Sequence, residues 1–202
     1  MIVERKTRFA HIVLHDSKDE DTIIQIFTRV MRLLTENPTI CKSDCAAEYC
    51  CPKVEAFLKD VHGVNEMRHS NEHNQAANGM VEKFGDTLGR GKRVVLLQSG
   101  LPLAFWGAAA IMVTDLYNST PHTSLGGDSP YFRRTGRKPD MSFFRPFGCS
   151  MVVHRGKDLV EHGCHNGKSA PRGEKGVCVV STHFGRRAFM CYSARANGYT
   201  PA

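Results

Sequence analysis

Residues 39–63 decide the fold, and they read TICKSDCAAEYCCPKVEAFLKDVHG. The apolar and β-branched residues at 39–41 predict a short strand that ends near Ser43 and Asp44. Pro52 suits the first turn of a helix, and apolar residues then recur at helical spacing as far as Gly63, a common helix stop. The stretch therefore places an acidic residue at the carboxyl end of a strand, shortly before a helix.

Outward from this stretch, strands and helices are expected to alternate. The expected elements are a strand at 8–15, a helix at 19–35, a strand at 64–68, a loop at 69–78, and helices at about 79–98, at about 102–118 and from Ser129. From Phe147 onward, short β-like runs separated by glycine-rich turns replace this pattern. The sequence thus predicts an α/β domain followed, from about residue 145, by a small all-β module.

Composition places the chain among globular proteins, since 41% of its 202 residues are hydrophobic and 23% are charged. No apolar run is long enough to span a bilayer, and the first residues lack the apolar core of a signal peptide. We therefore expect an intracellular protein with no membrane partner and with its eight cysteines as free thiols. A zinc site fits poorly with the spacing of its candidate ligands, Cys41, Cys45, Cys50, Cys51, His69 and His73.

The net charge of +7 is distributed unevenly along the chain. Residues 1–60 carry a net charge of −1, whereas residues 61–202 carry +8 and include a basic cluster at 133–138. Such a bias suits a phosphate-binding surface, and a solvated basic face would show the same composition. Charge alone leaves both interpretations open.

Two carboxylates are candidates for chemistry. Asp44 is expected at a strand end, and Glu82 in the first turn of the long helix, where Asp86, Arg90 and Arg93 share its face. A strand end and a helix can bring carboxylates together around hard cations such as Mg²⁺, and two such ions about 4 Å apart promote phosphoryl transfer. Solvated acidic side chains are the simpler alternative.

Blocks of sequence in register give a family resemblance across residues 1–200. The blocks are Lys42–Tyr49, similar to R-S-D-N-G-G-E-Y; Asn78–Lys83, similar to N-G-V-A-E-R; Ser99–Gly107, similar to S-G-L-P-x-x-F-W-G; Gly127–Tyr131, similar to G-K-T-P-Y; Thr135–Asp140, similar to T-G-x-K-P-D; and Phe147–Cys149, similar to F-G-C. Each block is unspecific alone, but together they keep the family's order and spacing. The chain resembles the integrases of copia-type retrotransposons.

The resemblance implies an α/β fold: a partial RNase H-like integrase core at 1–100 with its first strand missing, a helical extension at 101–145 and a small SH3-like β-barrel at 146–202. It implies that Asp44 and Glu82 match the second and third acidic positions of the catalytic site and bind Mg²⁺ or Mn²⁺. The implied reaction is the cleavage of retroelement DNA ends and their transfer into target DNA, in the nucleus, by a homo-oligomer.

Basic residues in the second part of the chain are the expected contacts to DNA. They are Lys83, Arg90, Arg93, Arg133, Arg134, Arg137 and Lys138. For the cluster at 133–138, a solvated face is an equal alternative.

The chain also departs from the family pattern. The family's first acidic position precedes the strand expected at 8–15, whereas Asp16 and Asp19 follow that strand, so neither replaces it. The Asn-Gly-Gly turn of the family is Cys45-Ala46-Ala47 here, which suits a positive φ poorly. Glycines at 85, 89 and 91 each cost the long helix up to about 1 kcal/mol relative to alanine.

We therefore expect an integrase-derived fragment that is inactive alone. One alternative is a nucleic-acid-binding remnant that acts through the basic second part. The other is an inert product of a degenerate element.

Overall fold

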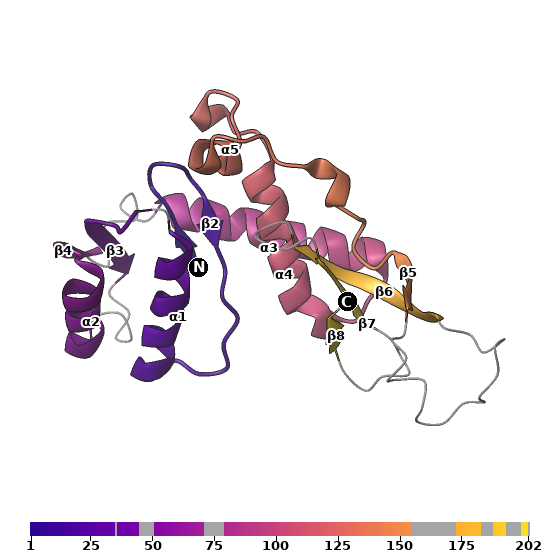
Figure 1. The fold of residues 1–202 in the computed structure, drawn as a ribbon, viewed down its shortest axis with the longest axis horizontal. Helices are drawn as coiled ribbons and strands as arrows, with labels where there is room; N and C mark the ends of the chain where they lie inside the picture. Colours follow the sequence, from indigo (N-terminus) through magenta and orange to yellow (C-terminus); the bar gives the residue numbers. More distant parts are fainter. Residues whose placement is uncertain are drawn as a thin grey trace. The chain divides into compact units, whose positions relative to one another are not determined.

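The computed structural model describes residues 1–34, 36–44, 51–70, 79–154, 173–182, 188–192 and 199–201. The chain divides into two compact units, whose elements are labelled in Figure 1. Unit 1 comprises Met1–Val3 and His11–Asp86, and unit 2 comprises Glu4–Ala10 and Thr87–Ala202. None of the helices in the described ranges has the length and apolar character needed to cross a membrane.

A parallel pair of strands forms the part of unit 1 that holds Asp44. Strand β3 (Ile40–Asp44) pairs with strand β4 (Glu66–Ser70), and helix α2 (Pro52–His62) connects them, because parallel strands need a crossover. The register pairs Ser43 with His69 and Asp44 with Ser70. Helix α2 ends as predicted at Gly63, whose φ of 66° is left-handed and unstrained in glycine.

The core of unit 1 lies between two helices. Helix α1 (Glu20–Leu33) begins at Asp19, whose Oδ1 accepts a hydrogen bond of 2.8 Å from the backbone N–H of Thr22. Apolar side chains of α1 then pack against those of α2 and of the segment that follows it. The buried residues of this core are Ile23, Met31, Val54, Leu58 and Val64, which shows that the helical spacing read from the sequence marks buried faces.

The strand predicted at 8–15 is wrong in extent. Only β2 (Ala10–His11) is paired, with β1 (Ile2–Val3). The chain turns tightly just before β2: the N–H of Glu4 donates to the carbonyl of Phe9 at 2.8 Å, and the N–H of Arg8 donates to the carbonyl of Glu4 at 2.9 Å. Arg8 has a φ of 61°, so this turn takes up the first residues of the predicted strand.

Helix α3 (Gly79–Ser99) confirms the long helix predicted at about 79–98, and the division between the units falls within it. Within unit 2, α3 approaches helix α4 (Trp106–Ser119) closely at Gly91. A Cβ added to Gly91 would lie 2.6 Å from Cγ1 of Val113. This glycine therefore permits helix packing, a role that its unfavourable helix propensity does not reveal.

The remaining helices of unit 2 are short. Turn η2 (Leu103–Phe105) precedes α4, so the helix predicted at 102–118 begins as a 3₁₀ turn. After α4 come η3 (Thr123–Leu125), α5 (Pro130–Thr135) and η4 (Met141–Phe143). Helix α5 confirms the short helix predicted from Ser129, whose hydroxyl accepts a hydrogen bond from the N–H of Phe132 at 3.1 Å.

An antiparallel sheet completes unit 2 and lies alongside α4 in Figure 1. Its strands β5 (Ser150–His154), β6 (Gly173–Thr182), β7 (Ala188–Tyr192) and β8 (Tyr199–Pro201) pair in chain order. The core between helix and sheet consists of Ala108, Ala109, Met112, Phe147 and Val179. The predicted change to β structure in this part of the chain is thus confirmed.

Strand β4 extends through Ser70, so His69 lies in a strand and not in the loop predicted from that residue. The rest of that loop, 71–78, and the Cys45-Ala46-Ala47 turn lie outside the described residues. The domain boundaries expected at residues 100 and 145 remain predictions.

Candidate metal centre and nucleic-acid interface

The two candidate metal ligands belong to the same unit. Asp44 is the last residue of β3, so it lies at the carboxyl end of a strand in a parallel pair, where α/β proteins commonly place their sites. Glu82 lies in the first turn of α3 and is exposed. Both residues therefore occupy the elements that the sequence predicts for them, while the side chain of Asp44 lies outside the described part of the structure.

The chemistry of this donor set fits the implied metal. Carboxylate oxygens are the ligands that Mg²⁺ and Mn²⁺ prefer, and Mg²⁺ is commonly held by one or two carboxylates together with water and substrate phosphates. Among the side chains that the structure describes, no three His, Cys, Asp or Glu residues are grouped to hold a metal ion. Of the cysteines weighed as zinc ligands, Cys41 and Cys51 are free thiols.

A chain of polar side chains lies beside the end of β3. Ser43 Oγ is 2.9 Å from His69 Nδ1, and His69 Nε2 is 2.9 Å from Glu55 Oε1 on α2. The hydrogen bond from His69, and then the nearby charge of Lys59 (3.5 Å from Glu55), lower the pKa of Glu55. The sequence does not reveal this chain, because Ser43 and His69 meet only through the β3–β4 register.

The basic residues predicted on α3 lie on its solvent-exposed surface. Arg90 and Arg93, both in unit 2, are exposed, and neither forms an ion pair with a described residue. Lys83, in unit 1, is also exposed. Guanidinium groups without acidic partners can bind phosphate without first breaking an existing ion pair.

Within the basic cluster at 133–138, Arg133 and Arg134 contact other residues of the protein, whereas Arg137 and Lys138 are exposed. Arg133 is 3.0 Å from Asp128 and also donates a hydrogen bond of 2.9 Å to the carbonyl of Leu125. Arg134 has a side chain only 10% exposed, with its guanidinium 4.3 Å from the centre of the Phe9 ring and 3.5 Å from Glu4. Arg137 and Lys138 are exposed and have no ion pair within the described ranges.

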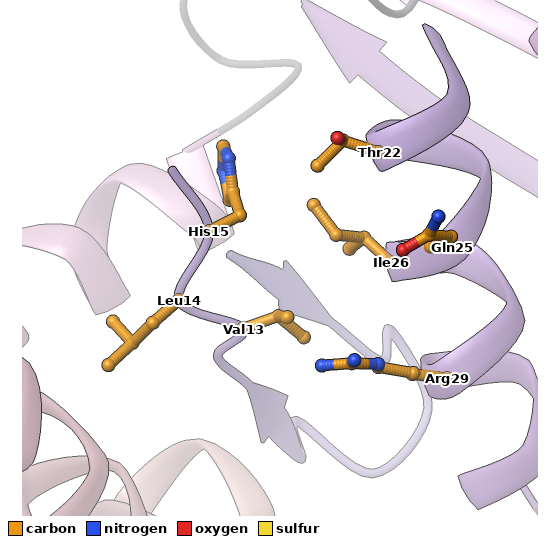
Figure 2. A pocket seen from close by; sticks show the side chains of 7 residues that line it. All are labelled: Val13, Leu14, His15, Thr22, Gln25, Ile26 and Arg29. Atoms are coloured by element: carbon orange, nitrogen blue, oxygen red, sulfur yellow. The ribbon is translucent and has the colours of Figure 1, made fainter. Parts of the chain in front are cut away.

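A cavity of about 180 Å³ lies in unit 1, and none of the predicted site residues lines it. Figure 2 shows the extended segment 13–15 facing α1, with Val13 directed toward Arg29 and Leu14 directed away from the helix. The residues that line it are Val13, Leu14, His15, Thr22, Gln25, Ile26 and Arg29. The lining carries no carboxylate, so this cavity has no donor set for a divalent metal.

Comparison with models of protein families finds no match. Among curated proteins, the chain is 27% identical over 149 residues to the retrovirus-related Pol polyprotein from transposon TNT 1-94 of Nicotiana tabacum. The match covers 70% of this chain and 11% of the tobacco polyprotein, so the chain spans about a tenth of the length of that relative.

Among solved structures, the chain resembles the HTLV-2 integrase catalytic core domain in complex with magnesium, in its trimeric form. The TM-score is 0.51 at 16% identity, over 65% of this chain and 80% of that one. A chain of the simian T-cell lymphotropic virus intasome in complex with PP2A regulatory subunit B56 gamma gives a TM-score of 0.47 at 11% identity, over 93% and 62% of the two chains.

The match to the tobacco polyprotein is a sequence similarity over 149 residues, and the likeness to the HTLV-2 domain is one of fold. The chain is a homologue of a segment of the copia-type retrotransposon Pol polyprotein, and its mixed α/β fold resembles a retroviral integrase catalytic core.

Proposed function

We propose that the chain is an integrase segment that handles DNA and binds a divalent metal ion through Asp44 and Glu82. The observation that carries this proposal is the placement of the two residues: one ends a strand of a parallel pair, and the other is exposed in the first turn of α3, in the same unit. The integrase core that the chain resembles was determined with magnesium, which supports the same choice of metal.

In this function the two carboxylates hold Mg²⁺ or Mn²⁺ by their oxygens. A bound ion of this kind supplies Lewis-acid activation of an oxygen that attacks a phosphodiester. Arg90 and Arg93 are exposed on α3 beyond Glu82 and supply positive charge for the DNA backbone. Retroelement ends and target DNA are the substrates of this proposal, with action in the nucleus and assembly into homo-oligomers.

We further propose that residues 1–202 do not catalyse strand transfer alone. Two acidic positions of the integrase pattern have matches in this sequence, and no residue matches the first. Two carboxylates would hold a divalent ion less firmly than three would, because fewer anionic oxygens would offset its charge. The antiparallel β5–β8 sheet is proposed as the SH3-like module of the same segment.

Manganese titration of the full chain tests the metal proposal, with binding followed by electron paramagnetic resonance. Asp44→Asn and Glu82→Gln are each expected to abolish saturable Mn²⁺ binding. Asp86→Asn is the matched control, because Asp86 is exposed one turn further along the same helix, and it should leave binding unchanged. Equal Mn²⁺ binding by all four proteins would refute the assignment.

A strand-transfer assay in Mn²⁺ tests the proposed lack of independent activity. The wild-type chain should give no product above the metal-only background. Robust transfer that Glu82→Gln abolishes would show instead that this chain is a complete catalyst.

A second candidate function is nucleic-acid binding without catalysis. It is favoured by the exposed cations of unit 2 that form no ion pair with a described residue, which are Arg90, Arg93, Arg137 and Lys138. Binding of this kind weakens steeply with salt, because each phosphate contact releases condensed counterions. A filter-binding titration at several salt concentrations measures it. Absence of measurable affinity at low salt would favour the inert-product alternative.

A further inference from the structure

A hydrogen-bonded chain of three side chains ties three elements of unit 1 together beside the last residue of β3. It runs from Glu55 on α2 through His69 on β4 to Ser43 on β3, with two contacts of 2.9 Å. His69 and Glu55 are partly buried, with side chains 23% and 28% exposed. Hydrogen bonds in such a setting are stronger than at an open surface, because water competes less well for the same groups.

Donor and acceptor chemistry fixes the direction of the hydrogen bond between His69 and Glu55. Ionised Glu55 can only accept, so His69 donates its Nε2–H to the Glu55 carboxylate. In the neutral form of the ring that carries its proton on Nε2, Nδ1 is an acceptor for the hydroxyl proton of Ser43. A carboxylate that fixes the tautomer and orientation of a histidine also fixes the group on the other side of the ring.

Ser43 connects this hydrogen-bonded network to the end of strand β3. Ser43 and His69 are register partners, and the next pair is Asp44 with Ser70, the last pair of the β3–β4 ladder. Strand ends fray, because their backbone hydrogen bonds have neighbours on one side only. A side-chain anchor one residue before the end limits that motion at the position where the proposed function needs a fixed carboxylate.

We propose that Glu55 and His69 are positioning residues, which act through Ser43 to hold the carboxyl end of β3, and with it Asp44, in the geometry that binds a divalent cation. This inference rests on the proposed function for its metal-binding part. Its positioning part concerns the backbone of β3 and holds or fails independently of metal.

Hydrogen exchange in the absence of metal tests the positioning part on the full chain. His69→Ala should make the backbone amides at the end of β3 exchange about tenfold faster, since two hydrogen bonds of a part-buried network are lost. Ser43→Ala should give the same local effect, because it removes the contact that reaches β3. His69→Gln should restore much of the protection, since an amide can donate to Glu55 and accept from Ser43.

The matched control is Arg68→Ala. Arg68 adjoins His69 on β4 but pairs with exposed Glu66, with two contacts of 2.8 Å, outside the three-residue chain. The Arg68→Ala variant should leave hydrogen exchange of the β3 backbone amides unchanged. The inference would be overturned if the β3 amides exchanged equally fast in His69→Ala and in the wild type. It would also be overturned if Arg68→Ala lost as much amide protection in β3 as His69→Ala does.

Manganese titration of the same proteins tests the metal part. His69→Ala should weaken Mn²⁺ binding about 10- to 100-fold, as loss of a group that orients a ligand typically does, and His69→Gln should recover part of it. If the wild type and Asp44→Asn bind Mn²⁺ equally, the proposed function fails, whatever the exchange data show. If Asp44→Asn abolishes binding and His69→Ala leaves it unchanged, the proposed function stands and the positioning inference is overturned.

Discussion

The side-chain amide of Asn118 pairs with both backbone polar groups of Ala10: Oδ1 accepts from the N–H at 2.8 Å, and Nδ2 donates to the carbonyl at 2.8 Å. Asn118 lies on α4 and is 1% exposed. The Asn118 side chain thus forms the pair of backbone hydrogen bonds that a neighbouring strand forms in a sheet. In this way it satisfies backbone groups of Ala10 that are buried away from water.

Asn118→Ala should destabilise unit 2 by about 2–3 kcal/mol, because it leaves a buried N–H and a buried carbonyl without partners. Urea denaturation followed by circular dichroism measures the loss. Thr120→Ala, which removes an exposed hydroxyl bonded to the carbonyl of Leu116 at the end of the same helix, is the control and should cost less than about 0.5 kcal/mol. Equal costs for the two variants would contradict the clamp role of Asn118.

Asp115, a buried carboxyl group on α4, should make stability fall as pH rises. Burial raises its pKa from 3.8 to about 7, and its side chain forms no ion pair or hydrogen bond within the described residues. The folded state therefore holds a proton that the unfolded state has released between about pH 4 and pH 7, so stability is lost as pH rises through that window. Above pH 7 the carboxylate is charged in both states, and the cost is fully present.

Asp115→Asn should consequently stabilise the protein above pH 7, by at most about 4 kcal/mol for a shift of this size, and have little effect below pH 4. Chemical denaturation at pH 4, 6 and 8 measures the difference between variant and wild type. The control Asp86→Asn, at an exposed position, should change stability by less than about 0.5 kcal/mol at each pH. A stabilisation that is the same at all three pH values would exclude the titration as its cause.

Two glycines of α3 separate helix propensity from helix packing. Gly91→Ala places a Cβ 2.6 Å from Val113 and should destabilise the protein by about 1–3 kcal/mol, although alanine is the better helix former. Gly89→Ala meets only the terminal nitrogen of Arg93 at 4.0 Å and should stabilise by about 0.5–1 kcal/mol. Thermal unfolding of the two variants measures the contrast, and stabilisation by both would show that α3 and α4 are not in close contact at Gly91.

These glycines show where sequence reasoning succeeds and where it stops. The spacing of apolar residues is local, so the long helix and the helix ended by Gly63 were predictable, as was Asp44 at a strand end. The close approach at Gly91, the clamp between Ala10 and Asn118, and the Ser43–His69–Glu55 chain each join residues far apart in sequence. Such pairs depend on register and packing, which a local pattern does not encode.

The sequence also predicts the boundaries of short strands poorly. An apolar run at 8–15 looks like a strand by composition, but the turn at Glu4–Phe9 takes up its first two residues, and only Ala10 and His11 are paired. The polar residues that follow His69 predict a loop from that residue, yet its pairing with Ser43 holds it in β4. In the first case the hydrogen bonds of a tight turn override the strand preference, and in the second case pairing with a distant strand overrides the loop preference.

Arg134 and Arg137 should separate a structural role from DNA contact within the cluster at 133–138. Arg134 is nearly buried, stacks on Phe9 and lies 3.5 Å from Glu4, so Arg134→Ala should destabilise unit 2 by about 1–2 kcal/mol and leave the DNA affinity of the folded protein unchanged. Arg137 is exposed, with no ion pair to a described residue. Arg137→Ala should leave stability unchanged, weaken DNA binding and reduce the salt slope by about 1.

Arg134→Lys is the variant that decides between the two roles for that position. It keeps the charge but loses the guanidinium group that lies over the Phe9 ring, so a structural role predicts a loss of stability smaller than that of Arg134→Ala and no change in DNA affinity. A phosphate contact predicts the reverse: stability retained, affinity reduced by the alanine variant and preserved by lysine. Denaturation and salt-dependent DNA titration on the same protein preparations distinguish these outcomes, because the first reports on packing against Phe9 and the second on charge available to DNA.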